Sequence, residues 1–329
     1  MQTFAEPGPT DYGVDRPRRT NELRERLQVM TMPAFGHVLT AMASPMLPDG
    51  TLDIDGAQKL AHHLAERGND GVVVAGTTGE SPTLTHAETL DLFSAVVDAA
   101  GSHAHVVAGV GKNDTAATVE LATEAAARGV DGVMLVTPYY NRPQTRGLEA
   151  HFATVAAAVD VPVLLYNIPG RTAAEVPPAS LLALAERVDN IVAVKDAVKD
   201  LDKAAWLVAR KPDDFHIYAG NDIDLLPLLA VGAVGVVSVA GHFVADRLAR
   251  MIERFPHDAA AARTEHLALL PLFQALFVES NPVPLKVGLD MAGLPGGPVR
   301  PPLARADDAT ITAMRTALAS AGIIAAGES

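Results

Sequence analysis

One stretch of sequence, DIDGAQKLAHHLAERGNDGVVVAGTTGES (residues 53–81), predicts a helix, a strand and a loop in succession. The first part places apolar residues on one helical face: Ala57, Leu60, Ala61 and Leu64. Gly68 then ends the helix. The strand GVVVAG is a run of small and β-branched residues, which is typical of a strand buried on both faces. Such a unit predicts parallel strands that are joined by helices.

The order of strand, loop and helix recurs along most of the chain. The eight strand candidates are HVLTAMA (from His37), GVVVAG (Gly71), HVVAGV (His105), GVMLVT (Gly132), PVLLYN (Pro162), IVAVK (Ile191), HIYAG (His216) and VGVVSV (Val234). Eight units fit a closed barrel better than an open sheet, and no G-x-G-x-x-G follows the first strand. We therefore predict the α/β class, with a (β/α)8 TIM barrel and a C-terminal helical appendage.

Three parts follow from this pattern. Residues 1–35 are rich in Pro, Gly, Asp and Arg and lack the apolar run of a secretory signal, so we expect a mobile N-terminal extension. Residues 36–256 carry the barrel. Strand signals stop after residue 256, and residues 257–329 are expected to form a C-terminal helical region.

Composition limits the classes of partner and chemistry. The formal charge of −13 argues against binding to nucleic acid or to an anionic membrane. The chain has no cysteine, which excludes disulfides, zinc–thiolate sites, iron–sulfur clusters and thiol catalysis, and fits a cytoplasmic protein. The longest apolar run, residues 225–241, is interrupted by proline and glycine, so it predicts a buried helix leading into a strand rather than a membrane span.

Lys195 is the first candidate for chemistry. In such barrels the active site lies at the carboxyl ends of the strands, and Lys195 ends the apolar strand that begins at Ile191. Burial there would lower the pKa of the amine and make it a nucleophile toward a ketone or aldehyde, giving an imine. The alternative is a structural lysine that pairs with Asp196 or another carboxylate.

Other strand ends supply groups that imine chemistry on a keto acid needs. Thr77 and Thr78, within GTTGES, offer hydroxyl and backbone N–H groups to a carboxylate, although the same motif could be an ordinary helix cap. Tyr166 ends the strand next to the lysine strand and could move a proton. Arg171, on the same loop, could bind a second carboxylate with two parallel hydrogen bonds.

Six motifs occur in this order along the chain: GTTGES, TPYYNRP, YNIPGRT, VKD, AGND and NPVPLK. Together they resemble the dihydrodipicolinate synthase family of pyruvate-dependent class I aldolases. The resemblance runs from about residue 36 to residue 322. It implies a barrel enzyme that condenses pyruvate with L-aspartate 4-semialdehyde to give the cyclic precursor of diaminopimelate and lysine.

The resemblance also implies a role for each matching residue. Lys195 would form the Schiff base with pyruvate, and Tyr166 would be the general acid and base. Thr77 would link Tyr166 to Tyr140, which would reach into the site of a neighbouring subunit. A dimer, or a dimer of dimers, is therefore expected.

Substrate binding is implied for four further residues. Thr78 would hold the pyruvate carboxylate, and Arg171 would bind the carboxylate of the semialdehyde. Val237 would contribute a backbone carbonyl, and Gly220 ends the seventh strand beside them. No metal or organic cofactor is implied, only the covalent pyruvate imine on Lys195.

Two alternatives stay open at this point. A related aldolase or lyase acting on a 2-keto-3-deoxy sugar acid would share the lysine and tyrosine, and a barrel without activity could serve as a binding protein. Some family members carry a lysine feedback site, and four of its positions match here: Ser81, His86, Asn113 and Tyr139. Alanine, histidine and glutamate of the sensitive members are replaced by Pro82, Thr89 and Ala117. We therefore predict weak or absent inhibition by lysine.

Overall fold

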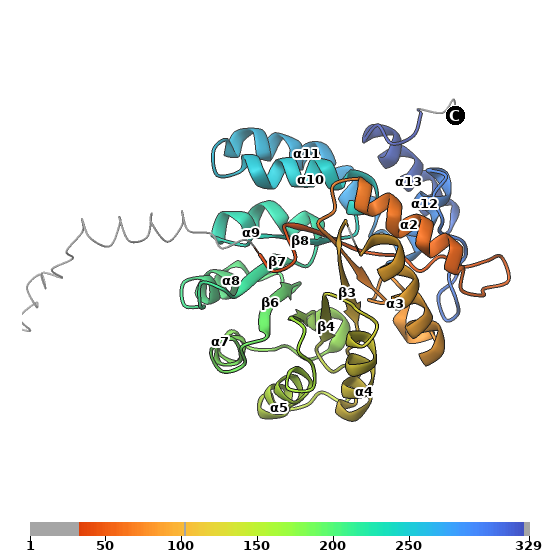
Figure 1. Cartoon of the computed structure of the whole chain (residues 1–329). Helices are drawn as coiled ribbons and strands as arrows, with labels where there is room; N and C mark the ends of the chain where they lie inside the picture. The colour runs from red at the N-terminus through yellow and green to blue at the C-terminus, as the bar shows by residue number, and fades with distance from the viewer. Residues whose placement is uncertain (1–32, 102, 326–329) are drawn as a thin grey trace, which may run out of the picture. The chain divides into compact units, whose positions relative to one another are not determined.

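The computed structural model describes residues 33–101 and 103–325. Eight parallel strands pair in chain order and close into a barrel, which confirms the predicted (β/α)8 fold (Figure 1). The strands are β1 (Val38–Ala41), β2 (Gly71–Val74), β3 (His105–Gly109), β4 (Gly132–Val136), β5 (Val163–Asn167), β6 (Ile191–Asp196), β7 (His216–Ala219) and β8 (Gly235–Ser238).

Helices follow each strand and surround the barrel (Figure 1). They are α2 (Ile54–Glu66), α3 (His86–Ala100), α4 (Thr115–Ala126), α5 (Thr145–Ala156), α7 (Pro178–Arg187), α8 (Leu201–Val208), α9 (Leu225–Val231) and α10 (Gly241–Arg254). The short helices η1 (Ser81–Thr83), α6 (Pro169–Thr172) and η2 (Asp222–Asp224) lie in the loops after β2, β5 and β7. The apolar run at residues 225–241 forms α9 and β8, as predicted.

Local sequence explains where these helices begin. The Asp53 carboxylate accepts from the Gly56 N–H at 2.8 Å and caps α2. Thr85 and Glu88 form a capping box at the start of α3. Gly68, with a φ of +88°, takes the left-handed conformation just after α2, as its place in the sequence predicts.

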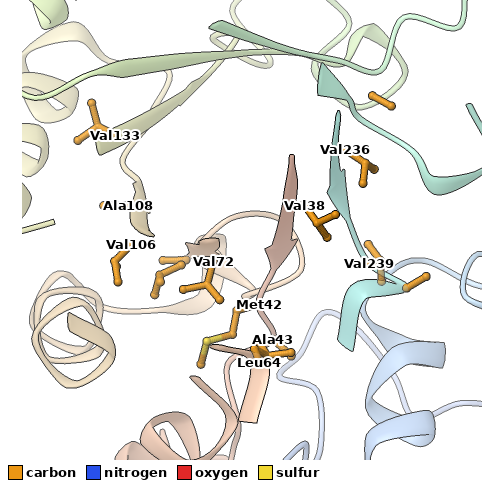
Figure 2. Close-up of a cluster of buried hydrophobic side chains, with 14 of the residues drawn as sticks. Val38, Met42, Ala43, Leu64, Val72, Val106, Ala108, Val133, Val236 and Val239 are labelled. Carbon is orange, nitrogen blue, oxygen red and sulfur yellow. The ribbon is translucent and has the colours of Figure 1, made fainter. Parts of the chain in front are cut away.

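Two separate cores result from the alternation of side chains along the strands. Val73 and Leu164 point into the barrel, together with Phe35. Val72 and Val106 point outward and pack beneath the helices, and Figure 2 shows this outer layer. The barrel interior is therefore filled with side chains at one end, and a cavity lies near the carboxyl ends of the strands.

Phe35, the last residue of the segment that we assigned to the N-terminal extension, is 1% exposed and belongs to the interior core. An aromatic ring next to a strand is stabilised by burial, and composition alone did not reveal this. The rest of the expected extension, residues 1–32, lies outside the described residues.

Three helices follow the barrel: α11 (Ala259–Ala275), α12 (Val283–Met291) and α13 (Asp308–Ser320). α11 packs against α10 and α13, and α12 packs against α13. Among residues 33–101 and 103–325, no helix has the length and apolar character needed to cross a membrane.

Candidate active site

Lys195 and Tyr166 lie side by side at the ends of neighbouring strands. β5 and β6 pair so that Tyr166 is opposite Lys195. Leu164 and Ala193, two residues earlier on each strand, belong to the interior core, so alternation turns both functional side chains into the barrel. The Lys195 Nζ lies 4.2 Å from the centroid of the Tyr166 ring. The structure therefore brings together the amine and the phenol that the sequence selects.

Burial changes the acid–base chemistry of both groups. Lys195 is 5% exposed, and desolvation lowers its pKa to about 7, with the Asp222 carboxylate opposing this change and Arg171 adding to it. Desolvation raises the pKa of Tyr166 to about 12, although Arg171 and a hydrogen bond with Thr77 act in the opposite direction. Near neutral pH the site thus contains a partly uncharged amine beside a protonated phenol.

Asp222 is a buried carboxylate that the sequence reasoning left without a role. It follows β7 and accepts hydrogen bonds from the Ser238 hydroxyl and from the N–H groups of Val239 and Ala240, the latter two at 3.0 and 3.1 Å. Burial raises the pKa of Asp222, and these three donors and Lys195 act against that rise. Its carboxylate thus joins the ends of β7 and β8 and interacts electrostatically with the Lys195 amine.

The GTTGES loop folds back on itself after β2. The Glu80 N–H donates to the Thr77 carbonyl at 3.1 Å. The Ser44 hydroxyl, from the loop after β1, donates to the Gly79 carbonyl at 2.7 Å. A Cβ at Gly79 would lie only 3.1 Å from Ala75 backbone atoms, so the tight turn favours glycine. The loop places Thr77 and Thr78 at the pocket.

Asn281 connects the C-terminal region to this loop. Its Nδ2 donates to the Thr78 hydroxyl at 2.9 Å, and its backbone carbonyl accepts from Arg171 Nη2 at 3.4 Å. The residue lies in the NPVPLK motif, which the sequence reasoning noted without giving Asn281 a role. Asn281 lies outside the strand–helix repeat of the barrel but within a motif that matches the family. This could have identified Asn281 as a residue of the site.

These elements enclose a cavity of about 300 Å³. Six of the eight residues selected from the sequence line it: Thr77, Thr78, Tyr166, Arg171, Lys195 and Gly220. Among the described residues that line it, the ionisable groups are Tyr166 and the bases Arg171, Lys195 and Lys199, and no carboxylate is present. A pocket of this kind suits anionic substrates, although the whole chain carries a charge of −13.

Two selected residues do not line the cavity. Val237 is 1% exposed within β8, and the pocket wall here is formed by Val239. Tyr140 is 89% exposed in the loop after β4 and has a φ of +72°, which a bulky side chain rarely adopts. The Asn141 side chain fixes this loop by donating to the Asn113 carbonyl at 2.8 Å.

Comparison with known proteins identifies the group to which the chain is related. The profile of the Dihydrodipicolinate synthetase family matches residues 34–321. The chain belongs to this family. The family resemblance that the motifs predict is thereby confirmed.

Individual members of the Dihydrodipicolinate synthetase family are close in sequence and in structure. A 4-hydroxy-tetrahydrodipicolinate synthase from Moorella thermoacetica is 50% identical over 291 residues, which are 88% of this chain and 99% of the relative. One from Symbiobacterium thermophilum is 47% identical over 89% of this chain and all of the relative. A crystal structure from Cyanidioschyzon merolae, described with lysine bound, superposes with a TM-score of 0.87 at 43% identity, covering 89% of this chain and 100% of that one.

Clusters of metal-binding side chains are absent from the described part of the chain. Residues 33–101 and 103–325 contain no group of three or more His, Asp or Glu side chains arranged to hold a metal ion. The reaction implied by the Dihydrodipicolinate synthetase family joins two carbonyl compounds with loss of water. Its atoms balance without an oxidant or a reductant.

Proposed function

We propose that the chain is a lyase of the class I aldolase type that condenses pyruvate with L-aspartate 4-semialdehyde to give 4-hydroxy-tetrahydrodipicolinate. The observation that carries this proposal is the buried Lys195 amine, whose pKa is lowered to about 7, lying 4.2 Å from the Tyr166 ring. The name of the relative that is 50% identical gives the substrates. The reaction belongs to the biosynthesis of diaminopimelate and lysine.

The chemistry begins with attack of the uncharged Lys195 amine on the keto carbon of pyruvate. Loss of water gives an imine, and loss of a proton from the methyl carbon gives an enamine. The enamine carbon attacks the aldehyde carbon of the second substrate, whose oxygen takes a proton. The amino group of that substrate then attacks the imine carbon and displaces Lys195, which closes the ring and frees the enzyme.

Tyr166 is the proposed proton carrier for these steps. Its phenol lies beside the amine, and Thr77 bonds to it. We assign Thr77 the role of linking Tyr166 to Tyr140 of a second copy of the chain. The 89% exposure of Tyr140 supports this assignment, since a tyrosine held out in solvent is available to a neighbouring subunit. The proposed assembly is a dimer or a dimer of dimers.

Binding of the two carboxylates is assigned to different walls of the cavity. Thr78 and the N–H groups around it receive the pyruvate carboxylate, and Arg171 receives that of the semialdehyde. Gly220 lines the cavity just after β7 and is assigned a contact with substrate; a Cβ there would lie 2.7 Å from the Ala197 Cβ and 2.8 Å from the Asp196 carbonyl oxygen. Val237 is assigned a backbone carbonyl contact.

The test is reductive trapping. The protein is incubated with pyruvate and borohydride, and the adduct is located by peptide mass mapping, with Lys195→Ala as the control. An adduct on Lys195 that is absent from the control supports imine chemistry, and its absence from folded protein contradicts the proposal. Consumption of pyruvate only with the semialdehyde supports the synthase, whereas release of pyruvate from a 2-keto-3-deoxy sugar acid would identify a lyase.

Two further parts of the proposal concern the cofactor requirement and the cellular location of the enzyme. The protein requires no metal or organic cofactor, so dialysis against a chelator should leave its turnover unchanged. The enzyme is cytoplasmic, which agrees with a chain that contains no cysteine. Fractionation of cells that express the full chain tests this location.

A further inference from the structure

A buried ion pair joins the C-terminal region to the Gly76–Ser81 loop. Glu80 Oε1 lies 2.5 Å from Lys286 Nζ, and the two side chains are 1% and 3% exposed. Glu80 Oε2 accepts from the Arg300 backbone N–H at 2.8 Å, and Lys286 donates to the Pro298 carbonyl at 2.8 Å. Neither charged residue lines the cavity, so the proposed chemistry does not use them directly.

The ion pair holds a backbone conformation that needs support. Glu80 has a φ of +54°, in the left-handed region that residues other than glycine seldom adopt. Its own N–H donates to the carbonyl of Thr77. Burying two charges costs desolvation energy, and an apolar pair of similar volume is often at least as stable. The ion pair therefore contributes more to the conformation of this loop than to the stability of the fold.

The same segment of chain makes two more contacts, one with the loop and one just beyond it. The Asn281 side chain donates to the Thr78 hydroxyl at 2.9 Å. Arg300 Nη1 donates to the Thr83 carbonyl at 2.8 Å, just beyond the loop. Residues 281–300 thus contact the loop at Thr78 and on both oxygens of Glu80. Within this set, Thr78 is the residue that both lines the cavity and is assigned to the pyruvate carboxylate.

We propose that Glu80 and Lys286 are positioning residues for pyruvate, because their ion pair sets the loop so that Thr78 meets the substrate carboxylate. This inference rests on the proposed function. It assigns part of the active site to the C-terminal helical region, since α12 carries Lys286. Loss of the ion pair should weaken pyruvate binding while the chemistry at Lys195 continues.

The experiment uses the full chain with two substitutions, Glu80→Met and Lys286→Met. This double variant removes both buried charges together, so neither is left without a partner. The pyruvate KM should rise about tenfold, the effect of losing roughly one hydrogen bond, with kcat within about twofold of wild type. Glu88→Gln is the matched control, because Glu88 pairs with the Arg300 guanidinium and not with the loop.

The outcomes separate positioning from a structural role. A double variant that melts near the wild-type temperature but has the wild-type pyruvate KM overturns the proposal. If the double variant does not fold, Glu80→Asp, which withdraws the carboxylate by one methylene, should raise the KM, and an unchanged value overturns the proposal. Wild-type protein that forms no pyruvate adduct refutes the proposed function and this inference together, whereas an adduct with unchanged variant KM refutes only the positioning role.

Discussion

Lys195 and Tyr166 are held by the barrel itself, whereas Thr77 and Thr78 are held by a loop that depends on distant parts of the chain. Backbone pairing between β5 and β6 sets the first two residues opposite each other. Thr78 is bonded to Asn281, which is 203 residues further along the chain. The two pairs face one cavity, but they reach it by different physical means.

This difference separates the tasks of the site. Strand pairing leaves little freedom, which suits groups whose pKa values depend on constant burial. The loop is tied by side-chain contacts, so substrate binding can change through substitutions far from the cavity. The strand pair, Lys195 and Tyr166, is therefore expected to control the rate of the chemical steps. In the loop pair, Thr77 and Thr78, it is Thr78 that is expected to control the affinity for pyruvate.

The largest effect is expected from Tyr166→Phe. Removing the hydroxyl group of Tyr166 removes the proposed proton carrier, so kcat should fall roughly 10²- to 10⁴-fold. The ring that packs beside Lys195 is retained, and the melting temperature should change little. Steady-state turnover and a thermal melting curve measure the two properties. If the variant retained wild-type turnover, Tyr166 would not control the rate of the chemical steps.

Mixing two inactive variants tests whether Tyr140 acts in a neighbouring subunit. Tyr140→Phe and Tyr166→Phe should each be nearly inactive as purified. After the subunits are exchanged in equal amounts, half of the dimers are mixed, and each mixed dimer has one site with both tyrosines. About a quarter of wild-type turnover should return. A mixture that stays inactive although mass spectrometry shows mixed dimers would place Tyr140 in the site of its own chain.

The pH dependence tests the amine directly. With the pKa of Lys195 at about 7, the amine is mostly protonated below that value and mostly neutral above it. The rate of imine formation should therefore rise about tenfold between pH 6 and pH 8. Quenching with borohydride at timed intervals measures this rate.

Asp222→Asn sharpens the same measurement. The Asp222 carboxylate favours the charged ammonium, so removing its charge should move the midpoint of the profile to lower pH. The amide has nearly the same size: its oxygen can still accept from the Val239 and Ala240 N–H groups, and its NH2 group can donate to the Ser238 hydroxyl. A midpoint near pH 10 in the wild-type protein would mean that the strand end does not desolvate Lys195.

The sequence predicted the strand pair more completely than the loop pair. Lys195 ends an apolar strand and Tyr166 ends the preceding one, and parallel neighbours must bring such residues together. The contacts of Asn281 and Lys286 could not be derived in this way. They depend on how the chain after α11 returns to the barrel, and no periodic pattern encodes that path.

Phe35 and Asp222 show two other limits of sequence reasoning. Phe35 lies next to a segment of polar and proline-rich composition, so its burial inside the barrel was not predicted. Asp222 stands in a motif that was noted, but its role depends on donors from β8 and the residues after it. Hydrogen bonds between the ends of different strands can be assigned only from the three-dimensional structure of the closed barrel.

The smallest effect is expected at Thr89 and His86, two positions of the lysine feedback site that the family resemblance implies. Thr89 is 2% exposed, and its hydroxyl donates to the Thr85 carbonyl at 2.9 Å, so it is already satisfied. His86 Nε2 lies 2.6 Å from a Glu124 carboxylate oxygen. Both polar groups are thus occupied within the chain, which lowers the gain from binding a free amino acid.

Millimolar lysine should therefore reduce turnover by less than half. The relative from Cyanidioschyzon merolae, described with lysine bound, provides the comparison enzyme in the same assay. Thr89→His combined with Ala117→Glu restores two residue types of the sensitive members, and inhibition should increase in this variant. Strong inhibition of the wild-type chain would contradict this prediction, because lysine would then bind despite the internal contacts of Thr89 and His86.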